Sequence, residues 1–184
     1  MTPFEYFSAM LSLILGLGIA QILAGVGRIL QYKGVRMYWV HALWAVLLLH
    51  FHFSLWWKFW SVREALQLNY ASFVLLLLGP MLLFFSARLL IPDFSDPGEA
   101  DLSDYYYSVR RIFLSVILVF FINGMFIDNV LTGEHLELTD IASHAESEAI
   151  PVLIAILYSQ RWVQGAAAVY VAMAAVFSVI AEIW

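Results

Sequence analysis

Five polar residues of kinds that bind protons or cations stand inside or beside apolar runs of this sequence: His52, Asn123, Asp128, His144 and Glu148. Carboxylates and imidazoles that lie together take up protons or cations, and histidine changes its charge between pH 5 and 8. Burying an ionisable group inside a membrane costs free energy, so finding one there suggests a functional site. We therefore predict a site that binds or conducts a small cation or a proton, with these five residues as ligands or proton carriers.

The apolar runs that must position these residues are long enough to cross a membrane. Of the 184 residues, 63% are hydrophobic and only 12% are charged, whereas about a quarter of an ordinary soluble domain is charged. A hydrocarbon core about 30 Å thick needs about 20 residues of α-helix. Because the runs are continuous rather than alternating, they indicate helices rather than barrel strands. We predict an all-α fold, a polytopic transmembrane helical bundle that forms one domain over residues 1–184.

Six spans are predicted, and five of them come from long apolar runs. The remaining span, the fifth in chain order over residues 139–160, is different. Only its residues 150–158 are uniformly apolar, and the preceding LTDIASHAESEA is polar. An interfacial stretch followed by a short re-entrant piece is the alternative, which leaves five spans. The predicted spans are residues 4–31, 37–60, 70–91, 107–130, 139–160 and 164–184.

The lysines and arginines near the span ends predict the orientation, because cytoplasmic loops carry an excess of them. With six spans, Lys58 and Arg63 fall on one side of the membrane. The other side has Arg28, Lys33, Arg36, Arg88, Arg110, Arg111 and Arg161. This second side is expected to face the cytoplasm. The protein is then expected in the inner (plasma) membrane of a cell, with both chain termini outside. The five candidate residues then lie in the outer half of the bilayer as a vestibule, or, in the alternative interpretation, as hydrated span ends.

The second span, HALWAVLLLHFHFSLWWKFW, poses the question of a cofactor. At 100° per residue, one face holds His41, Trp44, Leu48, His52 and Phe59, while His50 and Trp57 point nearly the opposite way. His41 and His52 are about 16 Å apart along the helix axis, so they cannot serve one haem. We predict no haem or other cofactor and no metal site, and with no catalytic motif present the sequence favours a role other than an enzyme.

Small residues in the first span predict a helix-packing face. Ser8, Ser12, Gly16 and Ala20 follow one another at intervals of four residues, and small side chains let helix backbones approach closely. Gln21, Gly25 and Arg28 lie on roughly the opposite face. The first span is therefore expected at the centre of the bundle, packed on two sides.

Two other classes of function stay open. One is a non-catalytic accessory or interaction subunit of a membrane complex, which would dock on partner helices through the first span and the Ala-rich last span. The other is a haem or quinone redox protein. The expected partners are the lipid bilayer and either further copies of the chain or a membrane partner subunit. The net charge of −5 argues against nucleic acid.

Three stretches carry a resemblance: FEYFSAMLSLILGLGIAQIL, LWAVLLLHFHFSLWWKFW and LLIPD. They resemble a group of small, uncharacterised bacterial multi-pass inner-membrane proteins, over roughly the first half of the chain. The resemblance implies a bacterial inner-membrane setting. It implies no activity and no role for any residue.

Overall fold

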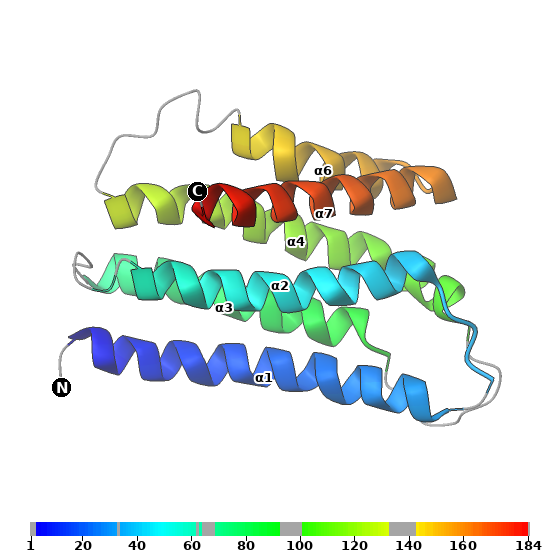
Figure 1. Ribbon diagram of the computed structural model, residues 1–184, viewed down its shortest axis with the longest axis horizontal. Coiled ribbons are helices and arrows are strands. Elements are labelled where there is room, and N and C mark those ends of the chain that lie inside the picture. The colour runs from blue at the N-terminus through cyan, green and yellow to red at the C-terminus, as the bar shows by residue number, and fades with distance from the viewer. Residues whose placement is uncertain are drawn as a thin grey trace.

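The computed structural model describes residues 3–32, 34–61, 63, 69–92, 101–132 and 143–183, with the backbone alone at residues 3, 128–132 and 181–183. In these ranges the elements are α1 (Pro3–Gln31), α2 (Trp39–Ser61), α3 (Tyr70–Leu90), α4 (Leu102–Thr132), the π-helix η1 (Ala145–Ala149), α6 (Ile150–Leu157) and α7 (Arg161–Ile183). The helices lie side by side in alternating directions, and α1 begins and α7 ends toward the same end of the bundle (Figure 1). The predicted all-α helical bundle is confirmed.

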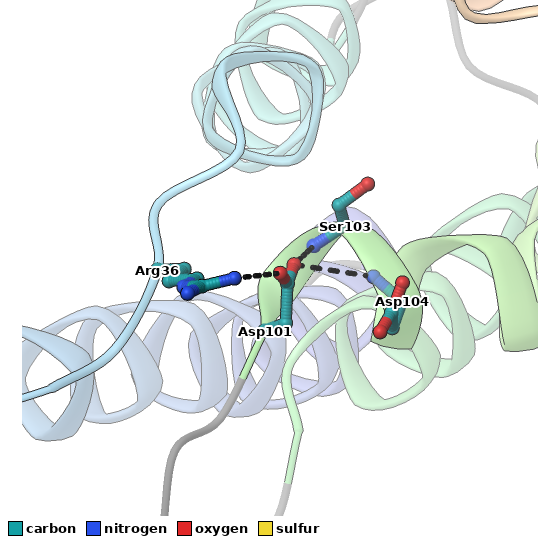
Figure 2. A network of polar contacts seen from close by, with 4 residues as sticks. All are labelled: Arg36, Asp101, Ser103 and Asp104. Carbon is teal, nitrogen blue, oxygen red and sulfur yellow. Dashed lines mark hydrogen bonds and ion pairs between the residues drawn. The ribbon is translucent and has the colours of Figure 1, made fainter.

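Five helices are long and apolar enough to cross a membrane: Phe4–Gln31, Trp39–Ser61, Tyr70–Leu90, Leu102–Ile127 and Arg161–Ile180. The predicted bounds agree within a few residues except at α4, which begins five residues before the predicted start at residue 107. Asp101 explains this early start, because its Oδ1 accepts hydrogen bonds from the backbone N–H groups of Ser103 and Asp104, at 2.7 and 3.4 Å (Figure 2). Such a cap satisfies donors that the first helical turn leaves free.

The cap of α4 is also tied to the connection between α1 and α2. Asp101 Oδ2 lies 3.9 Å from Arg36 Nη1, and the N–H of Leu102 donates to the Arg36 carbonyl at 3.1 Å. Figure 2 shows Arg36 reaching Asp101 from this connection. One end of the bundle is thus held by contacts between segments far apart in the sequence.

Among the described residues, the segment 139–160 contributes a shorter helical stretch than the other predicted spans do. Its described part begins at residue 143, and residues 143–157 form one continuous helical stretch in which η1 leads into the eight-residue α6. At 1.5 Å per residue this stretch is about 22 Å long, which is shorter than a hydrocarbon core of about 30 Å. It lies along α4 and α7 rather than across an end of the bundle (Figure 1). Within the described residues, five of the six predicted spans are long apolar helices and the remaining one is a shorter helical stretch, while residues 139–142 lie outside the described residues.

α1 lies at the edge of the bundle and contacts α2 and α3 among the described helices (Figure 1). Its buried face consists of Phe7, Leu11, Leu15, Gly18, Ile22, Gly25 and Ile29. In the predicted packing row, Ser8 is half-buried, Ser12, Gly16 and Ala20 are exposed, and a Cβ added at Gly16 would meet nothing within 4 Å. The expectation that this span sits at the centre of the bundle is wrong, because a helix that is apolar all round does not reveal which face meets a neighbour. That the row of Ser8, Ser12, Gly16 and Ala20 packs against another chain stays a prediction.

Two glycines on the buried face of α1 let neighbouring side chains approach its backbone. A Cβ added at Gly18 would collide with the His52 ring of α2, and one added at Gly25 would collide with Ile91. Close approach of this kind is the reason for small residues at helix contacts in membrane proteins.

The middle of the bundle is aromatic where α2 faces α4. Phe51 packs against Phe120 and Phe121, with ring centroids 5.8 and 5.5 Å apart. Trp44 meets Phe113 edge to face at 5.4 Å. Edge-to-face and tilted pairs of this kind stabilise a core beyond the area they bury, and here they fill the space between the two ends of the bundle.

Candidate functional site

The histidines of α2 divide into two buried residues and one cavity-lining residue. The predicted face of α2 is buried, with at most 2% exposure for His41, Trp44, Leu48, His52 and Phe59. His41 Nε2 lies 2.9 Å from the Leu90 carbonyl, and His52 Nδ1 lies 2.6 Å from the Leu48 carbonyl. Because a carbonyl only accepts, each of these ring nitrogens donates. The His41 ring therefore joins α2 to the last turn of α3, whereas the His52 ring bonds within α2.

His50 lies on the other side of α2 and lines a cavity of about 240 Å³ between α2, α4, η1 and α7, here named the histidine cavity. The His50 Nε2 lies 3.2 Å from the Ser54 hydroxyl. The polar lining residues are His50, Ser54, Lys58, His144, Glu148 and Ser178, and the others are Phe51, Leu55, Phe120, Phe121, Gly124, Ile127 and Ala175. Three titratable residue types from two distant parts of the chain thus share one cavity.

His144 and Glu148 form the η1 side of this cavity. The His144 Nδ1 lies 3.9 Å from the Glu148 Oε2, one helical turn away, and the two side chains are 43% and 32% exposed. A second groove, of about 500 Å³ between η1 and α7, is also lined by both residues, together with Ser143 and Ser147. The pair therefore stands between the histidine cavity and an open groove. An imidazolium beside a carboxylate is favoured over one without a partner.

The π-helical turn accounts for where this pair lies. The Ile150 N–H bonds to the Ala145 carbonyl, five residues back, instead of the four of an α-helix. Pro151 follows at once, and proline has no N–H to donate and crowds the carbonyl four residues before it. The turn widens at this point, which changes the face of the helix on which residues before Pro151 lie. Single π turns of this kind often occur at functional sites.

The other three predicted site residues have different places. His52 borders a separate groove between α1 and α2. Asn123 is buried, donates from Nδ2 to the Leu75 carbonyl at 3.3 Å, and packs beside Gly79, so it joins α4 to α3. The backbone of Asp128 follows the cavity-lining Ile127 in α4, and its side chain lies outside the described residues. The structure thus brings His144 and Glu148 together and adds His50, Ser54 and Lys58.

A buried polar cluster at the opposite end of the bundle was not found by sequence reasoning. Arg110, only 4% exposed, donates from Nη1 to the carbonyls of Ala155 and Ile156, at 2.8 and 3.3 Å. These carbonyls belong to the last turn of α6, where no backbone N–H group of the helix is left to donate to them. A cation at a helix C-terminus also complements the helix dipole. Arg110 therefore caps α6 from inside the bundle.

Gln164 of α7 completes this cap. Its Nε2 donates to the carbonyls of Ala155 and Tyr158, at 2.7 and 2.6 Å, and its Oε1 accepts from the Tyr106 hydroxyl at 2.8 Å. Gln164 and Tyr106 are fully buried. The cluster joins α4, α6 and α7 through satisfied hydrogen bonds. Sequence patterns offered one signal for it, a glutamine inside an apolar run.

These features define the class of protein. Five long apolar helices, buried polar side chains paired between helices and an aromatic middle are the features of an α-helical membrane protein. No protein family, curated protein or solved structure matches the chain. In the described part of the chain, no three His, Asp or Glu side chains gather closely enough to hold a metal ion together.

Proposed function

We propose that this chain is a multi-pass membrane protein whose histidine cavity binds protons from one side of the membrane. The observation that carries the proposal is the convergence on one cavity of His50 of α2, Glu148 of η1 and His144, the residue before η1. Histidine is the side chain whose charge ordinarily changes between pH 5 and 8. Protonation of either ring would add one positive charge to the cavity.

The composition of the cavity favours a proton over a metal cation. Hard cations need several oxygen ligands, and among the lining side chains Glu148 supplies the carboxylate. The Ser54 hydroxyl is bonded to His50, and the Ser178 hydroxyl donates to the Ala175 carbonyl. Lys58 lines the same space, and its positive charge repels a divalent metal ion about twice as strongly as a proton at the same distance. A proton does not need several oxygen ligands, because a single imidazole nitrogen holds it.

The aromatic middle of the bundle favours binding over conduction by a single chain. A path from the histidine cavity to Arg110 would have to pass the rings of Phe51, Phe121 and Phe113. These rings are packed and at most 7% exposed. The proposed site is therefore a proton-responsive vestibule closed at its inner end.

The charge distribution supports an orientation for this vestibule. Arg36, Arg110 and Arg161 belong to the end of the bundle opposite Lys58, as the alternating helix directions require (Figure 1). The excess of arginine on that end favours a cytoplasmic location. We infer that the vestibule and both termini face outward, in the inner membrane of a bacterium.

Histidine-selective NMR tests the proposal. Protein with labelled imidazoles in lipid nanodiscs is titrated from pH 8 to pH 5, and we expect the His50 and His144 signals to move to the protonated form. Glu148→Gln removes the partner of the His144 imidazolium, so we expect a lower protonated fraction of His144 at pH 6.5. Glu146→Gln is the matched control, because Glu146 is an exposed carboxylate of the same turn.

Two outcomes would contradict proton binding here. One is that neither ring changes between pH 8 and pH 5, and the other is that the two glutamine variants have equal effects on His144. Proton flux into proteoliposomes across a pH gradient separates binding from conduction. We expect the flux to equal that of empty vesicles.

A further inference from the structure

The groove of about 500 Å³ between η1 and α7, here named the η1–α7 groove, has two unlike walls. The wall from η1 is polar and includes Ser147 and Glu148. The wall from α7 includes Tyr170, Met173 and Phe177, which are 46%, 58% and 73% exposed. Contiguous exposed apolar side chains mark surfaces that meet a membrane or a partner. A molecule that enters the groove from the bilayer therefore meets an apolar wall and a polar wall together.

The serine hydroxyls of this groove present acceptors rather than donors. Ser147 donates from Oγ to the Ser143 carbonyl at 2.7 Å, and Ser178 donates from Oγ to the Ala175 carbonyl at 2.8 Å. A hydroxyl has one hydrogen and two lone pairs. Because each hydrogen is bound to a carbonyl of its own helical stretch, the two oxygens offer lone pairs to a ligand.

Glu148 adds a negative charge to these acceptors. Its Oε2 lies 3.9 Å from the His144 Nδ1, which is longer than a hydrogen bond of roughly 2.7–3.2 Å. An ionised carboxylate accepts hydrogen bonds and donates none. Ser147, Glu148 and Ser178 thus bring acceptor oxygens and one negative charge to the same groove. A primary ammonium group is the complement, because it has one positive charge and three N–H donors.

We propose that the η1–α7 groove binds a membrane-soluble amphiphile with a primary ammonium head and an apolar tail. The head donates to Glu148, Ser147 and Ser178, and the tail lies along the apolar wall of α7. A trimethylammonium head of the same charge has no N–H to donate, and an alcohol has one donor and no charge. The groove shares His144 and Glu148 with the histidine cavity, but ammonium binding does not require a histidine to change its charge.

Photolabelling with three matched probes tests this proposal. The probes are a hexadecylamine with a diazirine in its tail, its trimethylammonium derivative and the corresponding hexadecanol, each mixed at pH 8 into phosphatidylcholine nanodiscs that contain the purified protein. Mass spectrometry identifies the labelled peptides, and labelling of the η1 and α7 peptides is divided by that of α1 to correct for the amount of probe in the bilayer. We expect the primary amine to label the groove about three- to tenfold more than the trimethyl probe does, the ratio that one hydrogen bond provides, and the alcohol to label it least.

Two pairs of variants assign the label to the groove. Glu148→Gln removes the negative charge, and we expect it to lower labelling by the primary amine about tenfold, as for a hydrogen bond between charged groups. Glu146→Gln, in the same turn but outside the groove lining, should label like the wild type. Ala174→Leu fills the groove from α7 and should remove most of the labelling. Ala166→Leu, at an exposed position of α7 outside the groove, should preserve it.

Ser147→Ala tests the role of the hydroxyl acceptors. It keeps the charge of Glu148 and removes one oxygen that only an N–H can use. We therefore expect the preference for the primary amine over the trimethyl probe to shrink, while labelling by the trimethyl probe stays unchanged.

Three results would overturn the proposal: equal labelling by the three probes, labelling by the amine that Glu148→Gln or Ala174→Leu leaves unchanged, or a cross-link between two copies of the chain through the groove in place of probe labelling. The last result would assign the groove to an interface between copies. Labelling is measured at a single pH at which an ordinary imidazole is neutral. Failure here and failure of the proposed proton site, which is measured by histidine titration, are therefore distinguishable.

Discussion

Arg110 of α4, which is 4% exposed, donates a hydrogen bond to the main-chain carbonyl of Ala155 in α6 over 2.8 Å. The next residue, Arg111, is exposed. Two adjacent arginines thus have different roles, since one closes the end of a short helix within the bundle and the other belongs to the surface.

Arg110→Met is expected to destabilise the protein by about 2 kcal/mol, the range for a hydrogen bond from a charged group. The loss arises because the Ala155 carbonyl keeps one donor, Gln164, and the Ile156 carbonyl loses Arg110. Thermal unfolding in detergent measures the change. Arg111→Met is the control, and an equal loss in both variants would argue against a cap of α6.

Gly18→Ala is expected to cost about 1–3 kcal/mol, because the new methyl group collides with the His52 ring. Gly16→Ala, half a turn away on the exposed side of α1, should be neutral or stabilising by up to about 1 kcal/mol, the difference in helix propensity. The unfolding midpoints of the two variants give the comparison. If Gly16→Ala were the more damaging change, the face of α1 assigned to the core would be incorrect.

Asp101→Ala is expected to cost about 1 kcal/mol through loss of the helix cap. Asp101→Asn keeps a side-chain oxygen for the N–H groups of Ser103 and Asp104 but loses the ion pair with Arg36, whose side chain is 78% exposed. Exposed pairs contribute little, so we expect the Asn variant to unfold close to the wild type. A large loss with Asn would show that the ion pair, rather than the cap, stabilises this end.

Gly124→Leu is expected to weaken the pH response of His50 and His144 without removing a titratable group. Gly124 lines the histidine cavity and has room for a side chain, so leucine would fill the space that protons and water use. The NMR titration described for the proposed function measures the response. Gly27→Leu, outside the cavity, should titrate like the wild type.

Single cysteines report which end of the bundle faces outward, because the chain has no cysteine of its own. Ser61→Cys is exposed at the end of α2, and Ser159→Cys is exposed between α6 and α7 at the opposite end. We expect a membrane-impermeant maleimide to label Ser61→Cys in intact cells and Ser159→Cys after permeabilisation only. The reverse pattern would invert the proposed orientation.

The long helices could be predicted because a membrane sets both the length and the composition of a span. The helix period also predicts that His41, Trp44 and His52 share one face of α2, and the structure shows that this face is buried. Which face of α1 is buried could not be predicted, because nearly every face of that helix is apolar. Contacts with Gly18 and Gly25, rather than the row through Gly16, fix its place.

For the candidate site, the sequence named both His144 and Glu148, and the structure brings their side chains to 3.9 Å from each other. Their spacing of four residues is short-range information, so their proximity on a helix could be expected from the sequence. The choice of His52 over His50 rested on predicted depth alone, and depth does not determine which neighbour a side chain meets. The inward direction of Arg110 depends on where α6 ends, which hydropathy does not reveal.

The π-helical turn means that the number of residues in η1, and not their identity alone, decides where His144 and Glu148 point. Such a turn amounts to one residue inserted into an α-helix. Because the wide turn absorbs that residue, the helical stretches on either side of it keep their faces. Deleting Ala149 would restore regular winding, keep the spacing of the pair and move Glu148 around the axis into the place beside Ile150 that Ala149 holds. A single-codon deletion would therefore take the carboxylate out of its present place in the histidine cavity while leaving every ionisable residue in the chain.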